Sequence, residues 1–303
     1  MRTPTRLAIG LAAAVMVVAA CGDSGTEATD ESAATPSSSS ATTEAAATHG
    51  EYCLQHDDVE RCYLTVEPAD LAGPAPLVID IHGWGSNPST HRSYTGFAEL
   101  AETEGFVVAY PTGTQNSFNA GGLCCPPATT SDVDDVGYIL AIIDDVSARM
   151  DIDETRIYAT GHSNGCAMSQ RLAAEASDTI AAVACMALYL LTDASSDYTP
   201  VPILEIHGTD DAVVAYSTTG QFGWGALPNL ETWAELNQCA GEPITSPGPD
   251  DSAEYTTYED CADGTVVSLL TLDGVGHAPY APFGTSIDTT RIAWDFLRRY
   301  PAT

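Results

Sequence analysis

Lysine is absent from the chain, and ten arginines stand against 42 aspartates and glutamates. With histidine neutral, the formal net charge at pH 7 is −32. A surface of this charge repels the phosphates of nucleic acids and anionic membrane surfaces, so we expect no nucleic-acid partner. We interpret the acidity as a solvated surface and not as a binding site for a particular partner.

Large apolar side chains are missing between residues 22 and 50, where Ser, Thr, Ala, Glu and Asp dominate. Such a segment cannot bury enough apolar surface to fold, so we expect a flexible tether. Before it, Arg2 and Arg6 precede the apolar run Leu7–Ala20, which is typical of a signal peptide and short for a membrane span. The run ends in Val-Ala-Ala-Cys and resembles a bacterial lipobox, so we predict that Cys21 carries lipid. An ordinary signal peptide cut near the alanines is the alternative.

These segments predict three parts of the chain. A signal peptide spans 1–20, a lipidated cysteine and disordered tether span 21–50, and one folded domain spans 51–303. The protein would then be secreted and held at the outer face of the cell membrane by its lipid, or released outside the cell. We expect membrane contact through that anchor alone, and a monomer.

Eight cysteines remain when Cys21 is set aside. An even number behind a signal peptide is typical of disulfides formed in an oxidising compartment. Cys53–Cys62 would close a short local loop, and Cys239–Cys261 would bracket another. Three pairings are open to the other four, which are Cys124, Cys125, Cys166 and Cys185. No Cys-x-x-Cys pair or neighbouring His doublet supports zinc, so we expect no metal.

Strand-like and helix-like segments alternate along the rest of the chain. Apolar runs predict strands at 63–66, 77–82, 106–110, 156–160, 180–184, 201–208 and 266–272. Helices are expected at 97–104, 134–150, 167–173 and 286–300. This alternation predicts an α/β fold with a mainly parallel central sheet flanked by helices.

The segment Gly161-His162-Ser163-Asn164-Gly165 lies between a predicted strand and a predicted helix. Gly-x-Ser-x-Gly at such a junction is the nucleophile elbow of α/β-hydrolases, a strained turn that exposes the serine hydroxyl above the sheet. Side chains at 161 and 165 would collide with the neighbouring strand and helix, which explains the glycines. Because the motif also occurs by chance in turns, Ser163 needs partners to be identified as a nucleophile.

A serine nucleophile requires a general base, and the base requires an orienting acid. In α/β-hydrolases these follow in the order Ser, Asp, His, each after a strand. His277 follows the strand at 266–272 and is the predicted base. Two aspartates follow the strand at 201–208; Asp211 is the predicted acid and Asp210 its close rival. We interpret three further histidines near strand ends as structural: His82, His162 and His207.

The tetrahedral intermediate of such a reaction needs two backbone N–H donors for its oxyanion. Asn164, directly after the nucleophile, is one predicted donor, and Trp84 in the His-Gly-Trp-Gly turn is the other. The side chains of Trp84, Trp224 and Tyr280 are predicted to bind substrate, and the hydroxyl of Tyr280 would stay in water. Core packing is the alternative for Trp224 and Tyr280.

Between about Leu77 and Tyr300 the chain resembles the secreted polyhydroxybutyrate-depolymerase and feruloyl-esterase family of α/β-hydrolases. The resemblance rests on the elbow together with His82–Gly85, Gly105–Pro111, Asn119–Gly121 with Cys124–Cys125, Asp134–Gly137, His207–Asp211, Trp233–Cys239 and Gly276–His277. It implies an acid at Asp211, a Cys239–Cys261 bridge and hydrolysis of carboxylic esters without a cofactor. The chain departs from the family pattern where Ala-Pro-Tyr replaces Thr-Trp-Pro after His277, and where Cys166 replaces a glycine.

Few residues separate Ser163 from Asp211, so we expect no large cap domain and an open site. An open site suits a polymer or another bulky ester. The first interpretation is therefore a secreted serine esterase that depolymerises polyesters, either polyhydroxyalkanoates or aromatic polyesters. A feruloyl or acetyl-xylan esterase of plant cell walls is the alternative. A non-catalytic surface lipoprotein is a third interpretation, but the intact Ser–Asp–His order argues against it.

Overall fold

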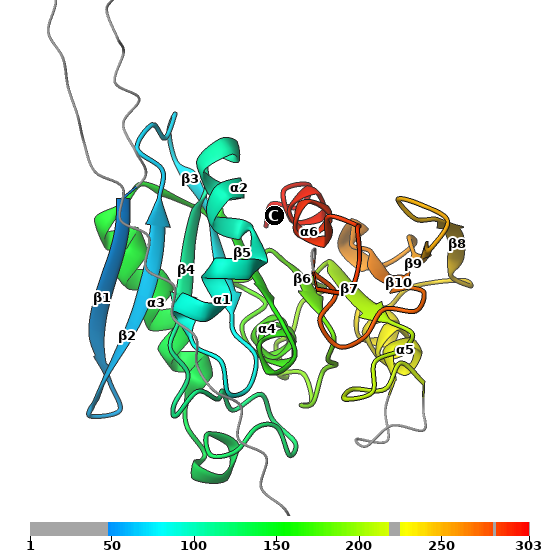
Figure 1. Cartoon of the computed structure of the whole chain (residues 1–303), viewed down its shortest axis with the longest axis horizontal. Coiled ribbons are helices and arrows are strands. Elements are labelled where there is room, and N and C mark those ends of the chain that lie inside the picture. The colour runs from blue at the N-terminus through cyan, green and yellow to red at the C-terminus, as the bar shows by residue number, and fades with distance from the viewer. Residues whose placement is uncertain (1–47, 218–224, 281–282, 303) are drawn as a thin grey trace, which may run out of the picture. The chain divides into compact units, whose positions relative to one another are not determined.

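The centre of the structure is a ten-stranded β-sheet with the order β1-β2-β4-β3-β5-β6-β7-β10-β9-β8 (Figure 1). This computed structural model describes residues 48–217, 225–280 and 283–302. The strands are β1 (Thr48–His56), β2 (Val59–Glu67), β3 (Ala75–Ile81), β4 (Val107–Pro111), β5 (Ile152–Gly161), β6 (Ala182–Met186), β7 (Ile203–Gly208), β8 (Ile244–Pro247), β9 (Ala253–Tyr258) and β10 (Val267–Leu272).

The central strands β4, β3, β5, β6, β7 and β10 run parallel to one another. At one edge β1 and β2 pair antiparallel with each other and with β4, and at the other edge β9 and β8 continue antiparallel from β10. The predicted α/β class with a mainly parallel sheet is confirmed. Because parallel strands share one carboxyl edge, β5, β7 and β10 all end on the same side of the sheet.

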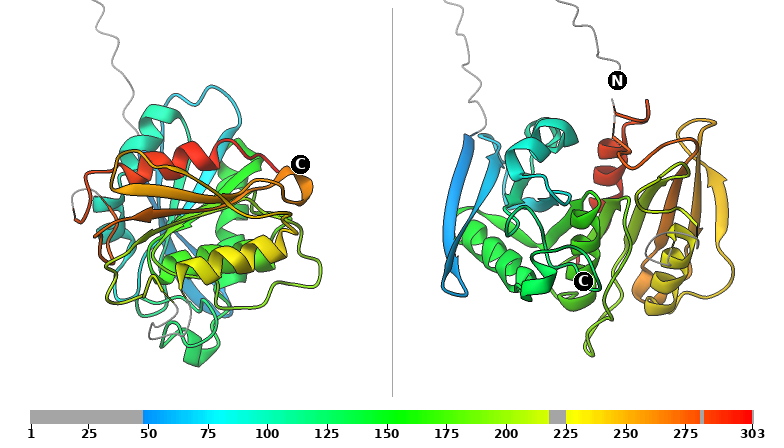
Figure 2. Two further views of the ribbon diagram at one scale, coloured as in Figure 1. Left: turned by 90° about the vertical axis from the view of Figure 1, so that its right-hand side faces the viewer. Right: turned by 60° about the horizontal axis from the view of Figure 1, so that its bottom comes forward.

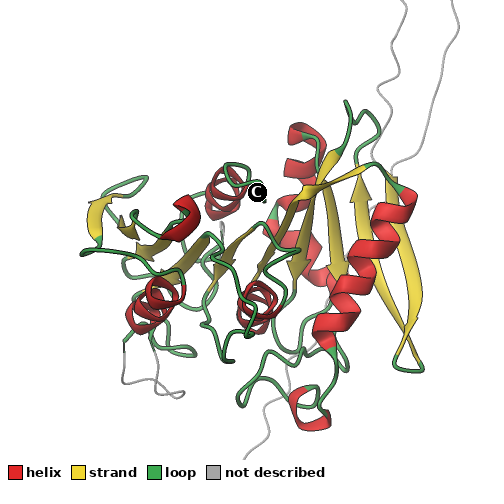
Figure 3. Cartoon of the chain, turned by 180° about the vertical axis from the view of Figure 1, so that it is seen from behind, coloured by secondary structure: helices red, strands yellow, loops and turns green. Residues whose placement is uncertain are grey.

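The described residues form α-helices on both faces of the sheet. These are α1 (Pro88–Thr95), α2 (Phe97–Glu104), α3 (Asp135–Arg149), α4 (Asn164–Glu175), α5 (Ala226–Leu236) and α6 (Thr289–Leu297). Helices α3, α4 and α5 pack into one apolar cluster, and α2 and α6 pack into a second. Figure 2 shows α5 and α6 on opposite sides of the sheet, and Figure 3 shows α3 in front of it. No helix in these ranges combines the length and apolar character that crossing a bilayer requires.

The side chains of β3 explain why this segment is a central strand. Leu77 and Ile79 belong to the cluster under α3, α4 and α5, whereas Val78 belongs to the cluster under α2 and α6. All seven residues of the strand are buried. A strand with both faces covered carries apolar residues on both, which is why Leu77, Val78 and Ile79 form a run instead of alternating with polar residues. Asp80 is the charged exception, and its buried carboxylate lies 2.7 Å from His91 Nε2.

Five elements are absent from the sequence prediction: β1, α1, α5, β8 and β9. Exposed and partly buried residues alternate along β1, and β8 is exposed along its whole length, so neither shows the run of a buried strand. Helix α5 contains Pro228 in its first turn, where a helix tolerates proline because no N–H is required there. The described fold also starts at Thr48, ahead of Glu51, where we expected the domain to begin.

Disulfides join all eight cysteines of the described ranges. Cys53–Cys62 links β1 to β2, and Cys239–Cys261 links the segment after α5 to the segment before β10. The pairings that the sequence left open are Cys124–Cys125 within one loop and Cys166–Cys185 between α4 and β6. The last of these fixes the helix behind Ser163 to the neighbouring strand.

The sheet core predicts a contrast between two apolar residues. Leu270 on β10 is 0% exposed, whereas Ile244 on β8 is 52% exposed. Leu270→Ala should lower the free energy of unfolding by about 2–5 kcal/mol, because it removes buried methyl groups and leaves a cavity. Ile244→Ala should change it by less than about 0.5 kcal/mol. Denaturant unfolding of both variants checks this, and equal losses would contradict the described packing.

Candidate active site

Ser163 lies at the junction of β5 and α4, on a strained turn. Its φ and ψ are 54° and −119°, a combination that residues with a side chain rarely adopt. The Ser163 N–H donates to the carbonyl of Met186 at 2.8 Å, and the Ser163 carbonyl accepts from the N–H of Cys166 at 2.8 Å. These backbone bonds hold the turn in place and leave the hydroxyl free for other partners.

Two glycines make this turn possible. A Cβ on Gly165 would lie 1.9 Å from the carbonyl oxygen of Ile81 in β3, and a Cβ on Gly161 would lie 2.5 Å from the same oxygen. The Cβ on Gly161 would also lie 2.8 Å from the backbone of Gly165 in α4. The predicted collision with the neighbouring strand and helix is confirmed, and no larger residue fits at either position without moving the backbone.

The loops after β10 and β7 bring a histidine and an aspartate to Ser163. The Ser163 hydroxyl donates to His277 Nε2 at 2.9 Å, and His277 Nδ1–H donates to Asp211 Oδ2 at 2.7 Å. The Asp211 side chain is buried and the His277 side chain is 20% exposed. This is the geometry of a nucleophile, a general base and an orienting acid.

The structure distinguishes the two candidate acids. Asp210 is exposed, whereas Asp211 is 6% exposed and its Oδ1 accepts from the N–H groups of Val213 and Val214, both at 2.8 Å. Burial raises the pKa of Asp211, but its interactions with His207 and His277 outweigh burial and hold the pKa well below its usual range. Asp211 is therefore an ionised carboxylate facing His277, and the geometry favours it over Asp210.

The two predicted oxyanion donors come from segments next to Ser163: Asn164 follows it directly, and Trp84 belongs to a nearby turn. A Cβ on Gly83 would lie 3.6 Å from Ser163 Cβ, so the turn that carries Trp84 passes beside the nucleophile. Within the described part of the chain, the N–H groups of Trp84 and Asn164 donate to no other protein group. The Asn164 side chain is engaged elsewhere, since its amide pairs with both backbone groups of Phe118 at 2.8 and 3.0 Å. Both N–H groups are thus available to a developing oxyanion.

Two contacts around His277 were not predicted. His162 Nε2–H donates to the His277 carbonyl at 2.5 Å, and burial lowers the pKa of His162 to about 3, so its ring is neutral. A Cβ on Gly208 would lie 2.0 Å from the carbonyl oxygen of Val275, so the loop before His277 packs directly on the end of β7. The glycine of the His-Gly-Thr-Asp-Asp segment is the sequence signal for this close approach.

The three predicted substrate-binding aromatics have different outcomes. The Trp84 side chain is 61% exposed, and its indole N–H donates to the Pro126 carbonyl at 2.8 Å. Trp224 lies outside the described residues. Tyr280 is 1% exposed, its ring lies 5.6 Å from that of Tyr94 in α1, and burial raises its pKa well above the usual value. The prediction that Tyr280 faces substrate and water is wrong, because the chain after His277 turns back into the core.

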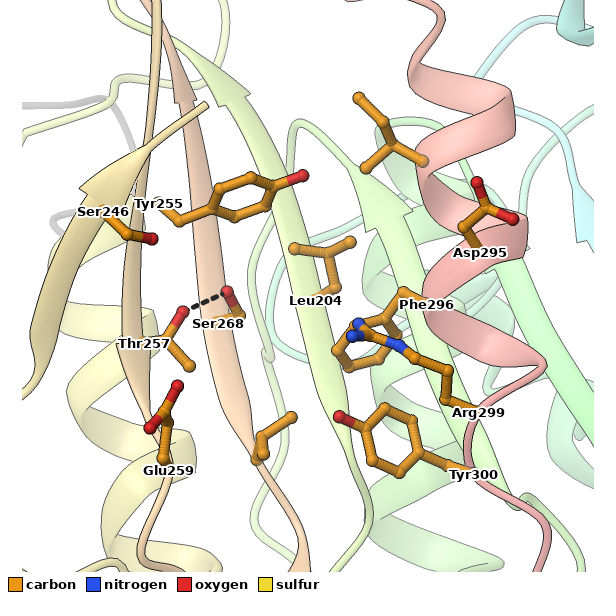
Figure 4. Close-up of a pocket in the computed structure, with 12 residues that line it drawn as sticks. Leu204, Ser246, Tyr255, Thr257, Glu259, Ser268, Asp295, Phe296, Arg299 and Tyr300 are labelled. Carbon is orange, nitrogen blue, oxygen red and sulfur yellow. Dashed lines mark hydrogen bonds between the residues drawn. The ribbon is translucent and has the colours of Figure 1, made fainter. Parts of the chain in front are cut away.

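A separate hollow of about 550 Å³ lies away from these residues. Figure 4 shows its lining, in which Tyr255 and Thr257 of β9 face Phe296 of α6 and the neighbouring Tyr300. The lining includes neither Ser163 nor any of its partners. The site chemistry therefore belongs to the carboxyl edge of the sheet and not to this hollow.

Comparison with known proteins decides the family. Residues 61–220, more than half of the 303-residue chain, match the family described as esterase PHB depolymerase. The chain belongs to this family. The matched region contains Ser163 and Asp211, whereas His277 lies beyond it. The resemblance inferred from the motifs is confirmed.

Among curated proteins, the chain is 31% identical over 242 residues to feruloyl esterase B from Piromyces equi. The aligned region covers 75% of this chain and 42% of that protein. It is 24% identical over 260 residues to poly(3-hydroxyalkanoate) depolymerase C from Paucimonas lemoignei. This second aligned region covers 76% of this chain and 61% of that protein. The chain thus spans less than two thirds of the length of either relative.

Among solved structures, an acetyl xylan esterase from Aspergillus awamori matches with a TM-score of 0.59 at 16% identity, over 77% of this chain and 96% of that one. A ferulic acid esterase from Anaeromyces mucronatus matches with a TM-score of 0.52 at 14% identity, over 84% of this chain and 90% of that one. These similarities confirm the predicted α/β-hydrolase fold.

The hydrogen bonds that link Ser163, His277 and Asp211 predict how single substitutions act on ester hydrolysis. Ser163→Ala and His277→Ala should each lower kcat by about 10⁴-fold or more, because each removes a group that forms or activates the nucleophile. Asp211→Asn should also cost several orders of magnitude, since an amide does not stabilise the imidazolium in the same way.

Asp210→Asn is the matched control, because it makes the same change at the exposed neighbour. Its kcat should stay within about twofold of the unsubstituted enzyme. Steady-state kinetics on a nitrophenyl ester checks all four variants. A greater loss for Asp210→Asn than for Asp211→Asn would contradict the acid assignment.

Proposed function

We propose that this chain is a serine carboxylesterase that acts on polymeric or bulky esters through an acyl-enzyme intermediate. The observation that carries the proposal is the hydrogen-bonded chain from Ser163 through His277 to Asp211. Its placement on a strained turn beside two free N–H groups matches what acyl transfer requires. Membership of the esterase family supports the same reaction.

Each residue has a defined part in the proposed cycle. His277 Nε2 takes the proton of the Ser163 hydroxyl as its oxygen attacks the ester carbonyl, and Asp211 stabilises the imidazolium that forms. The N–H groups of Trp84 and Asn164 bind the oxyanion. His277 then gives its proton to the leaving alcohol, which departs and leaves an acyl group on Ser163. A water molecule, deprotonated by His277, attacks this acyl group. His277 then returns the proton to the Ser163 oxygen as the carbon–oxygen bond to Ser163 breaks, which releases the acid and restores the free enzyme.

Exposed apolar side chains near the site support a large substrate. Four of them, Trp84, Leu123, Val213 and Phe283, form a set that we call the apolar rim, and each is between 54% and 83% exposed. Trp84 belongs to the oxyanion turn, Val213 follows Asp211, and Phe283 follows His277. Leu123 precedes Cys124, whose Sγ the Asn164 amide contacts at 3.7 Å. Exposed apolar side chains that flank the site residues in this way would offer a contact surface to an apolar chain, so we propose a polyester as substrate.

A substitution in the rim tests the proposed substrate. Trp84→Ala keeps the backbone N–H but removes the exposed indole, so it should lower hydrolysis of a polyester film about tenfold, the loss expected when part of an aromatic contact is removed. Cleavage of nitrophenyl acetate should stay within about twofold, because a two-carbon acyl group barely reaches the indole. Ile244→Ala, an exposed apolar residue on β8, is the control and should alter neither rate.

The same assay decides between the two ester classes. Soluble products released from polyhydroxybutyrate or aromatic polyester film, at rates well above those on methyl ferulate and acetylated xylan, are the expected result. Faster cleavage of methyl ferulate, with no product from either polymer, would overturn the polyester assignment in favour of a feruloyl esterase. Equal losses on film and nitrophenyl acetate in Trp84→Ala would overturn the role of the indole.

We also propose that the enzyme is secreted and held at the outer face of the cell membrane by lipid on Cys21, which lies outside the described residues. In cells fed a labelled fatty acid, the unsubstituted chain should carry the label and sediment with membranes. Cys21→Ser should carry no label and appear in the medium or periplasm. A Cys21→Ser chain that still carries the label and stays in the membrane fraction would refute the anchor.

A further inference from the structure

Asp211 contacts a second histidine, His207, which is buried. His207 Nε2 lies 3.3 Å from Asp211 Oδ2, the same oxygen that accepts from His277 Nδ1. On the other side of the ring, His207 Nδ1 lies 2.7 Å from Glu205 Oε1. His207 is 0% exposed and Glu205 is 2% exposed. Asp211 is therefore shared by two imidazoles, one facing the nucleophile and one facing the core.

The partners of His207 fix its protons. Its Nε2 lies 2.9 Å from the Val214 carbonyl, which only accepts, so this nitrogen carries hydrogen. Its Nδ1 faces a carboxylate oxygen, and the other oxygen of Glu205 accepts from the Asn229 amide at 2.6 Å. With acceptors at both nitrogens and a carboxylate beside each, the ring is an imidazolium, and its shorter contact is with Glu205.

The other side chains that the structure describes around His207 are uncharged, so they do not offset the charges of His207, Glu205 and Asp211. The ring of Tyr189, after β6, stacks on it at 5.8 Å, and the ring of Tyr216 meets it edge-on at 6.0 Å. Burial raises the pKa of both tyrosines, so both are neutral at ordinary pH. Thr271 of β10 is its register partner and carries no charge. Among the described residues, the charged groups facing His207 are Glu205 and Asp211, with His277 beyond.

Helix α5 holds the far end of this chain of contacts. Asn229 of α5 also donates to Gln170 Oε1 at 3.0 Å, and the Trp233 indole donates to the same oxygen at 2.7 Å. Gln170 in turn donates to the Leu188 carbonyl at 2.7 Å. Glu205 is thus bonded on both of its oxygens to groups that are themselves fixed, which keeps its carboxylate directed at His207.

We propose that His207, charged by Glu205, is a positioning residue that keeps the catalytic pair Asp211–His277 active in mildly acidic solution. This proposal rests on the esterase function proposed above. Its positive charge stabilises ionised Asp211 and opposes a second positive charge on His277 through their shared carboxylate. Removing that charge should therefore move the acidic side of the pH–activity profile to higher pH.

The electrostatics of the pair agree with this role. Burial lowers the pKa of His207, but its interactions with Asp211 and Glu205 outweigh burial and raise the pKa to about 10. The imidazolium thus persists through the pH range in which an esterase base must lose its proton. At the effective dielectric constant of about 20 usual for protein sites, the charge on His207 is close enough to shift the acidic side of the pH–activity profile by about one pH unit or more.

The first test needs no turnover. Nitrogen-15 NMR of the full chain should show one imidazole with both ring nitrogens protonated at pH 8.5, and Glu205→Gln should remove one of these two N–H signals. A ring at position 207 with a single protonated nitrogen at pH 8.5 would overturn the proposal. Because this signal does not depend on catalysis, it separates failure of this proposal from failure of the esterase assignment.

The second test is the pH–activity profile. His207→Gln can still donate to the Val214 carbonyl but carries no charge, so the acidic side of the kcat/KM profile should move up by about one pH unit. Glu205→Gln discharges the buried ring and should move it in the same direction. His56→Gln is the control. His56 ends β1, far from the site, and its Nε2 lies 3.1 Å from Asp134 Oδ2, so its loss should leave the profile unchanged.

The variants also separate charge from packing. Loss of activity by an equal factor at every pH, with a lowered Tm, would show that His207 only braces the loop, and would overturn the proposal. A shift of the Glu205→Gln profile to lower pH would show that His207 keeps its charge without Glu205, and would overturn the pairing. If His207→Gln does not fold, Glu205→Gln and the NMR signal of the unsubstituted chain still decide the question.

Discussion

The position of Ser163 depends on three chain segments lying closer together than side chains allow. The carbonyl oxygen of Ile81 at the end of β3 occupies the space that a Cβ on Gly161 or Gly165 would need, and these glycines begin and end the turn. Neither position has room for a Cβ, so the turn from β5 into α4 closes over two glycines. The backbone strain at Ser163 is maintained by this packing, and the serine hydroxyl is directed out of the sheet as a consequence.

The parallel sheet supplies the second requirement, since it brings residues distant in sequence to one edge. Strands β5, β7 and β10 end at the same edge of the sheet, with β6 between β5 and β7, and the segments that follow them carry Ser163, Asp211 and His277. The loops are held by further contacts of the same kind. Gly208 admits the backbone before His277, and the N–H groups of Val213 and Val214 fix the Asp211 carboxylate. Backbone contacts therefore place the turn and the two loops, and buried side chains around His207 support Asp211 from behind.

Much of this could be predicted from the sequence because it is encoded locally. A strand followed at once by Gly-x-Ser-x-Gly, by His-Gly-Thr-Asp-Asp or by Gly-His identifies strand ends and reactive residues together. What depends on contacts between distant segments could not be predicted. Tyr280 is buried because Tyr94 of α1 lies against it, and Cys166 pairs with Cys185 because α4 crosses β6. The partners of His207 come from β7 and the loop that follows it, and α5 reaches the ring only through Glu205, so the sequence context showed only a histidine near a strand end.

The central claim is that Ser163 is a nucleophile activated by its surroundings, and covalent labelling tests it most directly. A fluorophosphonate should react with the folded protein at one residue, and mass spectrometry of the digest should place the adduct on the peptide containing Ser163. Ser163→Ala should take up no label, and neither should the unfolded chain, because the hydroxyl is reactive only in this geometry. A folded protein that stays unlabelled, or that carries the adduct on another residue, would contradict the account.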